Sequence, residues 1–292
     1  MNSRIAFTTS DEFPRLTDDD RLAIMALEKQ GIQVESAIWT DPDVDWSSFS
    51  AVVIRSCWDY HLKPNDFLAW LEELEQRNVT LWNSPETVRW NLKKTYLDDL
   101  QQRGIPVLDS VWLTDSSKKD LNLIMRENGW DQVVVKPIIS AAAKDTENIQ
   151  LEEANDYQRE FETLLKRGGV IVQDFAAEIS TTGEWSLIFF NKEYSHSVLK
   201  KPQDGDFRVQ VDFGGKVHSA VAPDHLVRQA QKVVNSIEDD LLYARVDGIE
   251  RNGILTLMEL ELIEPLLFFE LNAEAPDRFA TALLHSLYKE EQ

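Results

Sequence analysis

The order of strand-like and helix-like segments in the N-terminal third constrains the fold of this chain more than any other feature. The strand-like runs are 4–8, 33–38, 51–55 and 79–82, and the helical patterns between them are 18–30 and 65–77. Strands that alternate with helices are typical of a parallel sheet covered by helices. We therefore expect a parallel α/β lobe over residues 1–92.

The segment after the third strand-like run lies where a parallel sheet binds its ligands, beyond the carboxyl ends of the strands. It follows the apolar run Ala51–Ile54 and is rich in polar and aromatic side chains. We therefore predict that it binds substrate. The candidate residues are Arg55, Ser56, Trp58, Asp59 and Tyr60.

The rest of the chain predicts two further lobes, which completes a three-lobe α/β (α+β) fold. Helix-like and strand-like segments alternate over 93–175 and favour a small central lobe. These segments are 95–103, 110–113, 132–136, 153–167 and 170–174. Strand-like runs at hairpin spacing predict an antiparallel sheet in a third lobe over 176–292. Its expected strands are 185–190, 194–198, 207–211, 217–220, 242–250 and 254–262, with helices over 224–241 and from Pro276.

The charge balance argues against several classes of protein. With 30 Lys+Arg against 51 Asp+Glu, the net charge is −21. A surface of this charge repels phosphate backbones, which argues against sequence-independent nucleic-acid binding. An acidic chain also supplies carboxylates for Mg²⁺. The balance is typical of a soluble enzyme that acts on small molecules.

Cysteine usage and apolar runs indicate the compartment. The single cysteine, Cys57, excludes an internal disulfide and fits a reducing environment. The longest apolar stretches, such as 266–269, are far shorter than the roughly 20 residues of a membrane span. Met1–Arg4 lead into a strand-like run without a secretory leader. We expect a cytoplasmic protein, and the sequence is compatible with a monomer or a homodimer.

Two glutamates on the run 254–262 are candidates for a metal site. Side chains of a strand alternate between two faces, so Glu259 and Glu261 share one face, with Met258 and Leu260 on the other. Two ionised carboxylates side by side repel each other unless a cation lies between them or water solvates them. The pair indicates either a Mg²⁺ site or a solvated sheet face.

Asp247 on the preceding strand joins this face in one of two hairpin registers. A two-residue turn at 252–253 pairs Arg251 with Ile254 and sends Asp247 to the opposite face. A three-residue turn pairs Glu250 with Ile254 and brings Asp247 beside the glutamates. A metal site shared by the three carboxylates requires the second register.

Cationic side chains that could bind an anion lie near the ends of predicted elements. Lys136 ends an apolar strand, where it needs either an internal carboxylate or an anionic ligand. Lys93 and Lys94 begin a helix, where cations oppose the helix dipole and a bound phosphate would relieve the repulsion. Arg208 carries a planar fork that suits phosphate or carboxylate, with a surface ion pair as its alternative. No nearby serine or cysteine suggests a hydrolase triad around His196, which we expect to be structural.

These residues occur in the order typical of the ATP-grasp superfamily of ligases, which the chain resembles over nearly its whole length. The matching motifs are Asn83-Ser84-Pro85 through Lys94, Val134-Val135-Lys136-Pro137, Val172-Gln173-Asp174-Phe175, Gly183-Glu184, Gly205-Asp206-Phe207-Arg208, Val246-Asp247 and Met258-Glu259-Leu260-Glu261. More narrowly, the segments 55–60, 195–198 and 257–265 are similar to those of D-cycloserine-forming cyclo-ligases. The resemblance implies the three-lobe ATP-grasp architecture.

The resemblance implies a binding site for ATP. Lys94 and Lys136 would contact the phosphates, with the lysine before Lys94 as its alternative. Asp174 and the backbone around Phe175 would receive the adenine. Glu184 would hold the ribose.

The resemblance also implies the chemistry and the metal. Arg208 would meet the γ-phosphate and the acyl phosphate formed from it. Asp247, Glu259 and Glu261 would carry Mg²⁺ or Mn²⁺, and residues 58–60 would bind the amino-acid end of the substrate. The substrate carboxylate attacks ATP, and an amine then displaces phosphate. Cations and metal offset the charge on the transferring phosphoryl group.

Two features depart from the family pattern. The metal motif of most relatives reads Glu-x-Asn, whereas the third ligand position here is Glu261, which adds a negative charge. A true Glu-x-Asn occurs later, at Glu270-Leu271-Asn272, and is the alternative metal pair. The segment Ser140–Thr146, which would cover ATP, lacks glycine, so other small residues would have to allow close backbone approach.

The sequence as a whole predicts an ADP-forming, Mg²⁺-dependent carboxylate–amine ligase with a small amino-acid-like or peptide substrate. Ligation of two molecules and intramolecular ring closure are both open. A nucleotide-binding protein without turnover, favoured by the glycine-free loop, is the alternative from another class. A kinase-like phosphotransferase is a further alternative and would give a stable phosphorylated product.

Overall fold

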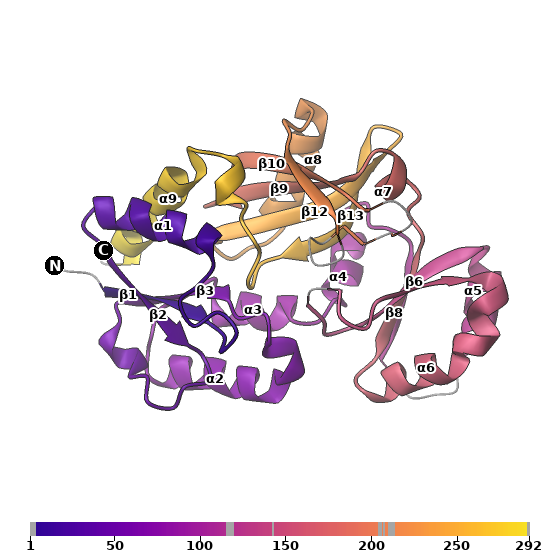
Figure 1. Cartoon of the computed structure of the whole chain (residues 1–292), viewed down its shortest axis with the longest axis horizontal. Helices are drawn as coiled ribbons and strands as arrows, with labels where there is room; N and C mark the ends of the chain where they lie inside the picture. Colours follow the sequence, from indigo (N-terminus) through magenta and orange to yellow (C-terminus); the bar gives the residue numbers. More distant parts are fainter. Residues whose placement is uncertain are drawn as a thin grey trace.

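The computed structural model describes residues 4–114, 120–141, 143–203, 206, 208–209 and 214–290. Three sheets, each with its own helices, follow one another along the chain (Figure 1). This is the mixed α/β architecture that the sequence predicts, and the lobe boundaries after residues 92 and 175 stay predictions. No helix within the described ranges combines the length and apolar character needed to cross a lipid bilayer.

The first sheet has four parallel strands in the order β2-β1-β3-β4, which confirms the predicted parallel lobe. Its elements are β1 (Arg4–Thr9), α1 (Asp18–Lys29), β2 (Gln33–Ile38), β3 (Ala51–Ser56), α2 (Pro64–Gln76) and β4 (Leu81–Trp82). Thr17 and Asp20 form a reciprocal capping box that begins α1, and Pro64 is the first residue of α2. Local sequence signals therefore set where both helices begin.

The C-terminal helix α9 (Ala275–Glu290) returns to the first lobe and packs against α1 (Figure 1). Phe279 of α9 meets Phe7 of β1 edge-on, with ring centroids 6.2 Å apart. It also meets Phe190 of the third sheet at 5.4 Å. Because burial of a phenylalanine contributes about 1.5–3 kcal/mol, this cluster helps to hold the first and third sheets together.

The second sheet is antiparallel, in the order β5-β8-β6-β7. Its elements are β5 (Ser110–Leu113), α5 (Leu121–Asn128), β6 (Gln132–Pro137), β7 (Glu147–Gln150), α6 (Ala154–Lys166) and β8 (Val170–Asp174). Helices α3 (Pro85–Asn91) and α4 (Tyr96–Gln102) precede it in the chain. Val133, Val135 and Phe161 are fully buried in the core between the sheet and its helices.

The third sheet is antiparallel, as predicted, in the order β11-β10-β9-β12-β13. Its elements are α7 (Glu178–Thr181), β9 (Glu184–Phe190), β10 (Glu193–Lys201), β11 (Lys216–Ser219), α8 (Asp224–Asn235), β12 (Tyr243–Arg251) and β13 (Ile254–Glu261). Helix α8 buries Leu226, Ala230 and Val234 against the sheet. Short 3₁₀ helices are η1 (Trp46–Ser48), η2 (Tyr60–Leu62), η3 (Leu151–Glu153) and η5 (Phe269–Leu271).

Some predicted elements differ from those observed. Helix α8 ends at Asn235 rather than at 241, because the residues after it serve another element. The carboxylate of Asp239 accepts hydrogen bonds from Ser84 Oγ and Thr87 Oγ1 at 2.7 and 2.6 Å, at the start of α3. Helices α3, α5 and α7 and strand β7 were not predicted from the sequence. The predicted strand 207–211 lies largely outside the described residues.

Candidate active site

One cavity of about 350 Å³ lies among the three lobes and brings most of the predicted site residues together. Its lining comes from the second and third sheets, from α4 and the residues just before it, and from the loops after β3 and β13. Its charged and aromatic residues are Trp58, Tyr60, Lys94, Tyr96, Lys136, Asp174, Glu184, Lys200, Arg208, Arg245, Asp247, Glu259, Glu261, Glu264 and Phe268.

A β-bulge brings Asp247 opposite Glu259. The β12–β13 turn pairs Arg251 with Ile254, which is the two-residue turn expected to send Asp247 to the wrong face. Met258 is an extra residue in β13 and shifts the register, so Asp247 pairs with Glu259 after all. The prediction that a three-residue turn is needed to bring Asp247 beside the glutamates is therefore wrong. Met258, expected on the opposite face, lines the cavity with Glu259.

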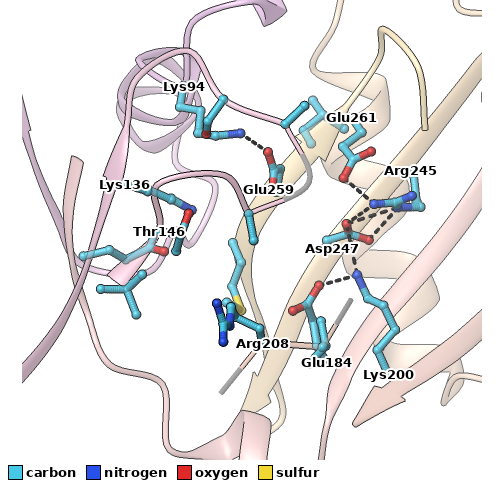
Figure 2. A pocket seen from close by; sticks show the side chains of 18 of the residues that line it. Lys94, Lys136, Thr146, Glu184, Lys200, Arg208, Arg245, Asp247, Glu259 and Glu261 are labelled. Carbon is cyan, nitrogen blue, oxygen red and sulfur yellow. Dashed lines mark hydrogen bonds and ion pairs between the residues drawn. The ribbon is translucent and has the colours of Figure 1, made fainter. Parts of the chain in front are cut away.

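Asp247 is the centre of a buried group of charges on β9, β10 and β12 (Figure 2). Arg245 donates to its carboxylate from Nε at 3.1 Å and from Nη2 at 2.9 Å, and Ser186 donates from Oγ at 2.5 Å. Lys200 bridges Asp247 and Glu184, with N–O distances of 3.4 and 2.5 Å. Burial acts to raise the pKa of Asp247, but Arg245 and Lys200 outweigh it and hold this pKa below its usual value. The carboxylate is thus kept ionised inside the protein.

A second set of ion pairs joins the glutamates of β13 to cations (Figure 2). Lys94 Nζ donates to Glu259, and Arg245 Nη2 donates to Glu261. Burial acts to lower the pKa of Lys94, but Glu259 outweighs it and raises this pKa above its usual value. Lys136 forms no ion pair with any described residue, and burial lowers its pKa. A cation without a carboxylate partner is suited to an anionic ligand.

The three carboxylates predicted to bind metal have the right chemistry but face cations. Across the described ranges, no three carboxylate, imidazole or thiol groups lie close enough together to hold a metal ion. The ion pairs explain this, because Asp247, Glu259 and Glu261 are turned toward Lys94 and Arg245. Mg²⁺ needs only one or two carboxylates when water and phosphates supply its other ligands. The donor set therefore fits Mg²⁺ once these side chains turn away from the cations.

The alternative phosphate-binding lysine, Lys93, and the alternative metal pair, Glu270 and Asn272, lie outside the cavity lining. Lys93 is exposed, whereas Lys94 is buried and lines the cavity. Glu270 is exposed, and Asn272 Oδ1 accepts a hydrogen bond from the amide of Glu274 at 3.1 Å. The geometry favours Lys94 and the earlier pair of glutamates.

Of the two residues predicted to receive the adenine, one lines the cavity and the other does not. Asp174 lines the cavity and lies 3.9 Å from Arg251. Phe175 is absent from the lining, its amide donates to the carbonyl of Gln132 at 3.2 Å, and the next residue, Ala176, lines the cavity. That the backbone around Phe175 receives the adenine stays a prediction.

Arg208 and the small-residue loop also border the cavity. The guanidinium of Arg208 pairs with Asp206 at 2.8 Å, and its side chain is partly exposed. Ser140 and Thr146 line the cavity with two alanines of the loop, while residue 142 lies outside the described residues. Ala143 has a φ of 53°, which non-glycine residues rarely adopt. The glycine-free loop thus contains an alanine in the left-handed backbone conformation that usually favours glycine.

The predicted substrate loop divides into two groups. Trp58 and Tyr60 line the cavity. The other three predicted residues, Arg55, Ser56 and Asp59, do not. Their side chains hydrogen-bond to other groups of the protein, so this geometry does not support the predicted contact of these three residues with substrate.

The engaged side chains have clear partners. Arg55 Nε donates to Asp20 at 2.8 Å, and both side chains are 2% exposed. Ser56 Oγ donates to the same carboxylate. Asp59 accepts a hydrogen bond from Trp39 Nε1 at 2.8 Å. These contacts hold the loop in place.

The sequence analysis missed two cations of the cavity, Arg245 and Lys200. Simple strand geometry could have identified both residues. Arg245 lies two residues before Asp247 on the same strand and so shares its face. Lys200 lies directly across the β9–β10 hairpin from Glu184. An account of cross-strand neighbours would have found both.

Comparison with known structures defines the class of the protein. The chain superposes on D-alanine–D-alanine ligase from Bacillus anthracis with a TM-score of 0.72, over 99% of this chain and 100% of that one, at 14% identity. It superposes on the ATP-grasp ligase PsnB, solved with a phosphomimetic variant of its minimal precursor, Mg and ADP, with a TM-score of 0.64. That match covers 98% of each chain at 15% identity. The fold is that of the ATP-grasp ligases.

Closer similarity defines the family. Residues 5–83 match the family model of the N-terminal domain of D-cycloserine synthetase DcsG. The cycloserine biosynthesis protein DcsG of Streptomyces lavendulae is 31% identical over 272 residues, which cover 88% of this chain and 90% of that protein. The crystal structure of D-cycloserine synthetase DcsG superposes with a TM-score of 0.86 at 29% identity, over 98% of this chain and 100% of that one. The chain belongs to the D-cycloserine synthetase family of ATP-grasp ligases and is an ATP-dependent carboxylate–amine ligase.

Proposed function

We propose that the cavity binds ATP and converts a small carboxylic acid into an acyl phosphate, which an amine then attacks. The observation that carries the proposal is the convergence of cations and carboxylates from two sheets on one cavity. Lys94 and Lys136 would bind the phosphates, and Glu184 would hold the ribose. Phosphoryl transfer needs positioning and charge stabilisation more than covalent chemistry from side chains. This set of side chains supplies both.

The ion pairs of the cavity support an exchange of partners when ATP binds. Asp247, Glu259 and Glu261 would hold Mg²⁺, which when bound offsets negative charge on the transferring phosphoryl group. Lys94 and Arg245 would then turn to phosphate or substrate oxygens. Because each charge exchanges one opposite charge for another, the exchange leaves no buried ion unpaired. The Mg and ADP in the PsnB structure support this by analogy of fold.

The reaction would proceed in two displacements. A carboxylate oxygen of the acid attacks the γ-phosphorus, and the bond to the bridging oxygen breaks and leaves ADP. The amine then adds to the acyl carbon, loses a proton and expels phosphate. Arg208 and Arg245 line the cavity and would stabilise the negative charge that develops on phosphoryl and acyl oxygens.

Intramolecular ring closure is a second candidate. It is favoured by the 31% identity to the cycloserine biosynthesis protein DcsG over 88% of this chain. D-Cycloserine is a cyclic amino-acid derivative, so an acid and an amine of one molecule would react with each other. The same cavity chemistry serves both forms.

Turnover assays would separate these forms. The protein is incubated with ATP, Mg²⁺ and a panel of amino-acid-like and peptide acids, with and without an added amine, and ADP release and product mass are measured. Ligation of two molecules requires the added amine, whereas ring closure proceeds without it and gives a product lighter than the acid by one water.

Trapping tests the intermediate. Hydroxylamine added to the reaction should convert the acyl phosphate into a hydroxamate of the acid. A stable phosphorylated product that resists hydroxylamine would instead indicate a kinase-like phosphotransferase. Calorimetric binding of ATP without acid-stimulated ADP release across the panel would contradict the proposal and favour a nucleotide-binding protein without turnover.

A further inference from the structure

One carboxylate of the cavity has no role in the proposed reaction. Glu264 follows β13, lines the cavity and is 9% exposed. Tyr60 lines the cavity beside it, and its hydroxyl acts to lower the pKa of the Glu264 carboxyl. Among the described residues, no lysine, arginine or histidine forms an ion pair with Glu264. Two neighbouring cations are engaged elsewhere, Lys94 with Glu259 and Arg245 with other carboxylates.

The backbone around Glu264 is fixed by side chains rather than by regular secondary structure. Consecutive carbonyls from Leu262 to Leu267, which we call the carbonyl row, each accept a hydrogen bond from a different side chain. The donors, in order, are Asn83, Tyr243, Trp58, Arg55, Arg245 and His196, at 2.8, 2.8, 3.1, 3.1, 2.9 and 3.0 Å. An irregular segment whose carbonyls are all bound in this way is held rigid. The rigid backbone fixes the point from which the Glu264 side chain reaches the cavity.

The carbonyl row explains why the loop after β3 is rich in polar and aromatic residues. Arg55 and Trp58 reach from the first lobe to the carbonyls of Pro265 and Glu264. Tyr60 of the same loop acts on the pKa of the Glu264 carboxyl. The loop therefore acts through Glu264, and most of its polar groups do not touch the cavity themselves.

The surroundings of Glu264 favour a cationic ligand. Burial raises the pKa of Glu264 to about 7, and Lys94 opposes this only in part. Glu259 adds further negative charge nearby. Trp58 and Phe268 line the same cavity and add aromatic rings, whose faces attract cations. A buried carboxylate without a counter-ion is stabilised when a cation binds beside it.

We propose that Glu264 recognises the ammonium group of an amine-bearing substrate, with Tyr60 as a positioning residue for its carboxylate. This inference rests on the proposed function, which makes the cavity a substrate site, and it assigns the residue that recognises the amine of the substrate. An ammonium group offers three donors to the carboxylate. A hydroxyl in its place offers one and leaves Glu264 without a cation. The site therefore selects amino acids over the matching hydroxy acids.

Calorimetric binding tests this without turnover. The full chain, saturated with Mg²⁺ and a non-hydrolysable ATP analogue, is titrated with D- and L-serine and D- and L-alanine, and with the matching glycerates and lactates. We expect the preferred amino acid to bind about 10- to 100-fold more tightly than its hydroxy acid. Glu264→Gln keeps the shape but removes the charge. It should abolish this preference while the affinity for the hydroxy acid changes by less than about threefold.

Two more variants keep the test sharp if Glu264→Gln fails to fold. Tyr60→Phe removes only the hydroxyl and should weaken amino-acid binding by about 3- to 10-fold, with hydroxy-acid binding unchanged. Glu270→Gln makes the same chemical change on an exposed side chain of the same region and should change nothing. Thermal unfolding and analogue binding confirm that each variant is folded.

The outcomes are separable from those of the proposed function. A preference for the amino acid that disappears in Glu264→Gln supports the inference, even if no ADP is released. The absence of ADP release would contradict only the proposed reaction. A wild type without preference for the amine, or a Glu264→Gln variant with undiminished preference, overturns the inference even if turnover is normal.

Discussion

Two regions of the cavity satisfy their buried polar groups in different ways. On the third sheet, Glu184, Lys200, Arg245, Asp247, Glu259 and Glu261, together with Lys94, form a charge cluster in which each ion faces an opposite charge. In the carbonyl row, single hydrogen bonds to neutral carbonyls hold the backbone, and Glu264 is left without a cation. The charge cluster is suited to exchange partners with ATP and metal, whereas the carbonyl row is suited to hold one group still.

The two regions should also respond differently to mutation. Removing one member of a buried ion pair leaves the other unpaired and costs about 3–5 kcal/mol. Removing one neutral hydrogen bond costs about 1 kcal/mol. Each ion of the charge cluster therefore depends strongly on its partners, whereas the carbonyl row can lose one hydrogen bond at a small cost in stability.

Glu259→Gln should have the largest effect, on turnover. The variant keeps an acceptor for Lys94 but loses the charge that would hold Mg²⁺, so we expect kcat to fall by about 1,000-fold or more. The measurement is steady-state ADP release with a saturating acid. Glu270→Gln is the matched control and also tests the alternative Glu-x-Asn pair. If Glu270→Gln lost turnover and Glu259→Gln kept it, the metal assignment would be wrong.

Arg245→Met should have the next largest effect, on stability. It leaves Asp247 and Glu261 without the guanidinium that bridges them, so the free energy of unfolding should fall by about 3–5 kcal/mol. Urea unfolding measures this change. The matched control is Arg4→Met, which breaks a partly exposed ion pair with Glu35 and should cost less than about 1 kcal/mol. Equal losses in the two variants would contradict the distinction between buried and surface pairs.

Sequence analysis predicted the sheets well because strand and helix periodicity is a local property. The parallel first sheet and the antiparallel third sheet follow directly from it. The hairpin register shows where local rules fail. Both registers considered for Asp247 assumed regular pairing, and the bulge at Met258 obeys neither. A bulge depends on packing between strands, which the spacing of residues does not reveal.

The sequence indicated which types of residue form the candidate site, but it did not indicate the partner of each residue. Arg55 after a strand has the pattern of a ligand-binding residue, yet its partners are Asp20 and the carbonyl of Pro265. These partners are far away in the sequence, so no local pattern could assign them. Lys136 differs, because a lysine at the end of a buried strand already indicates a need for an anion.

Acidification should destabilise the fold through the buried imidazole of His196, because burial disfavours its charged form. Its Nε2 donates to the carbonyl of Leu267, and burial lowers its pKa from 6.5 to about 4. The unfolded chain therefore binds a proton at higher pH than the folded protein does. The stability that this histidine contributes is present above pH 6.5 and is lost as the pH falls to about 4, a total of about 3 kcal/mol.

His196→Gln checks this pH dependence, because the amide of glutamine can donate to the same carbonyl but does not titrate. The free energy of unfolding should fall less steeply between pH 6.5 and 4 in the variant than in the wild type. Urea unfolding at several pH values gives both slopes. Identical slopes would show that His196 has no part in the acid sensitivity of the fold.

Lys136→Met should have the smallest effect on stability and so mark the boundary of the charge cluster. Lys136 forms no ion pair with any described residue and burial disfavours its charge, so its loss should not lower the free energy of unfolding. Affinity for an ATP analogue, measured by calorimetry, should still fall by about 10- to 100-fold, because a phosphate contact is lost. Lys94→Met, which leaves Glu259 unpaired, should lower both quantities. If Lys136→Met destabilised the fold as much as Lys94→Met, Lys136 would belong to the internal charge network rather than to the nucleotide.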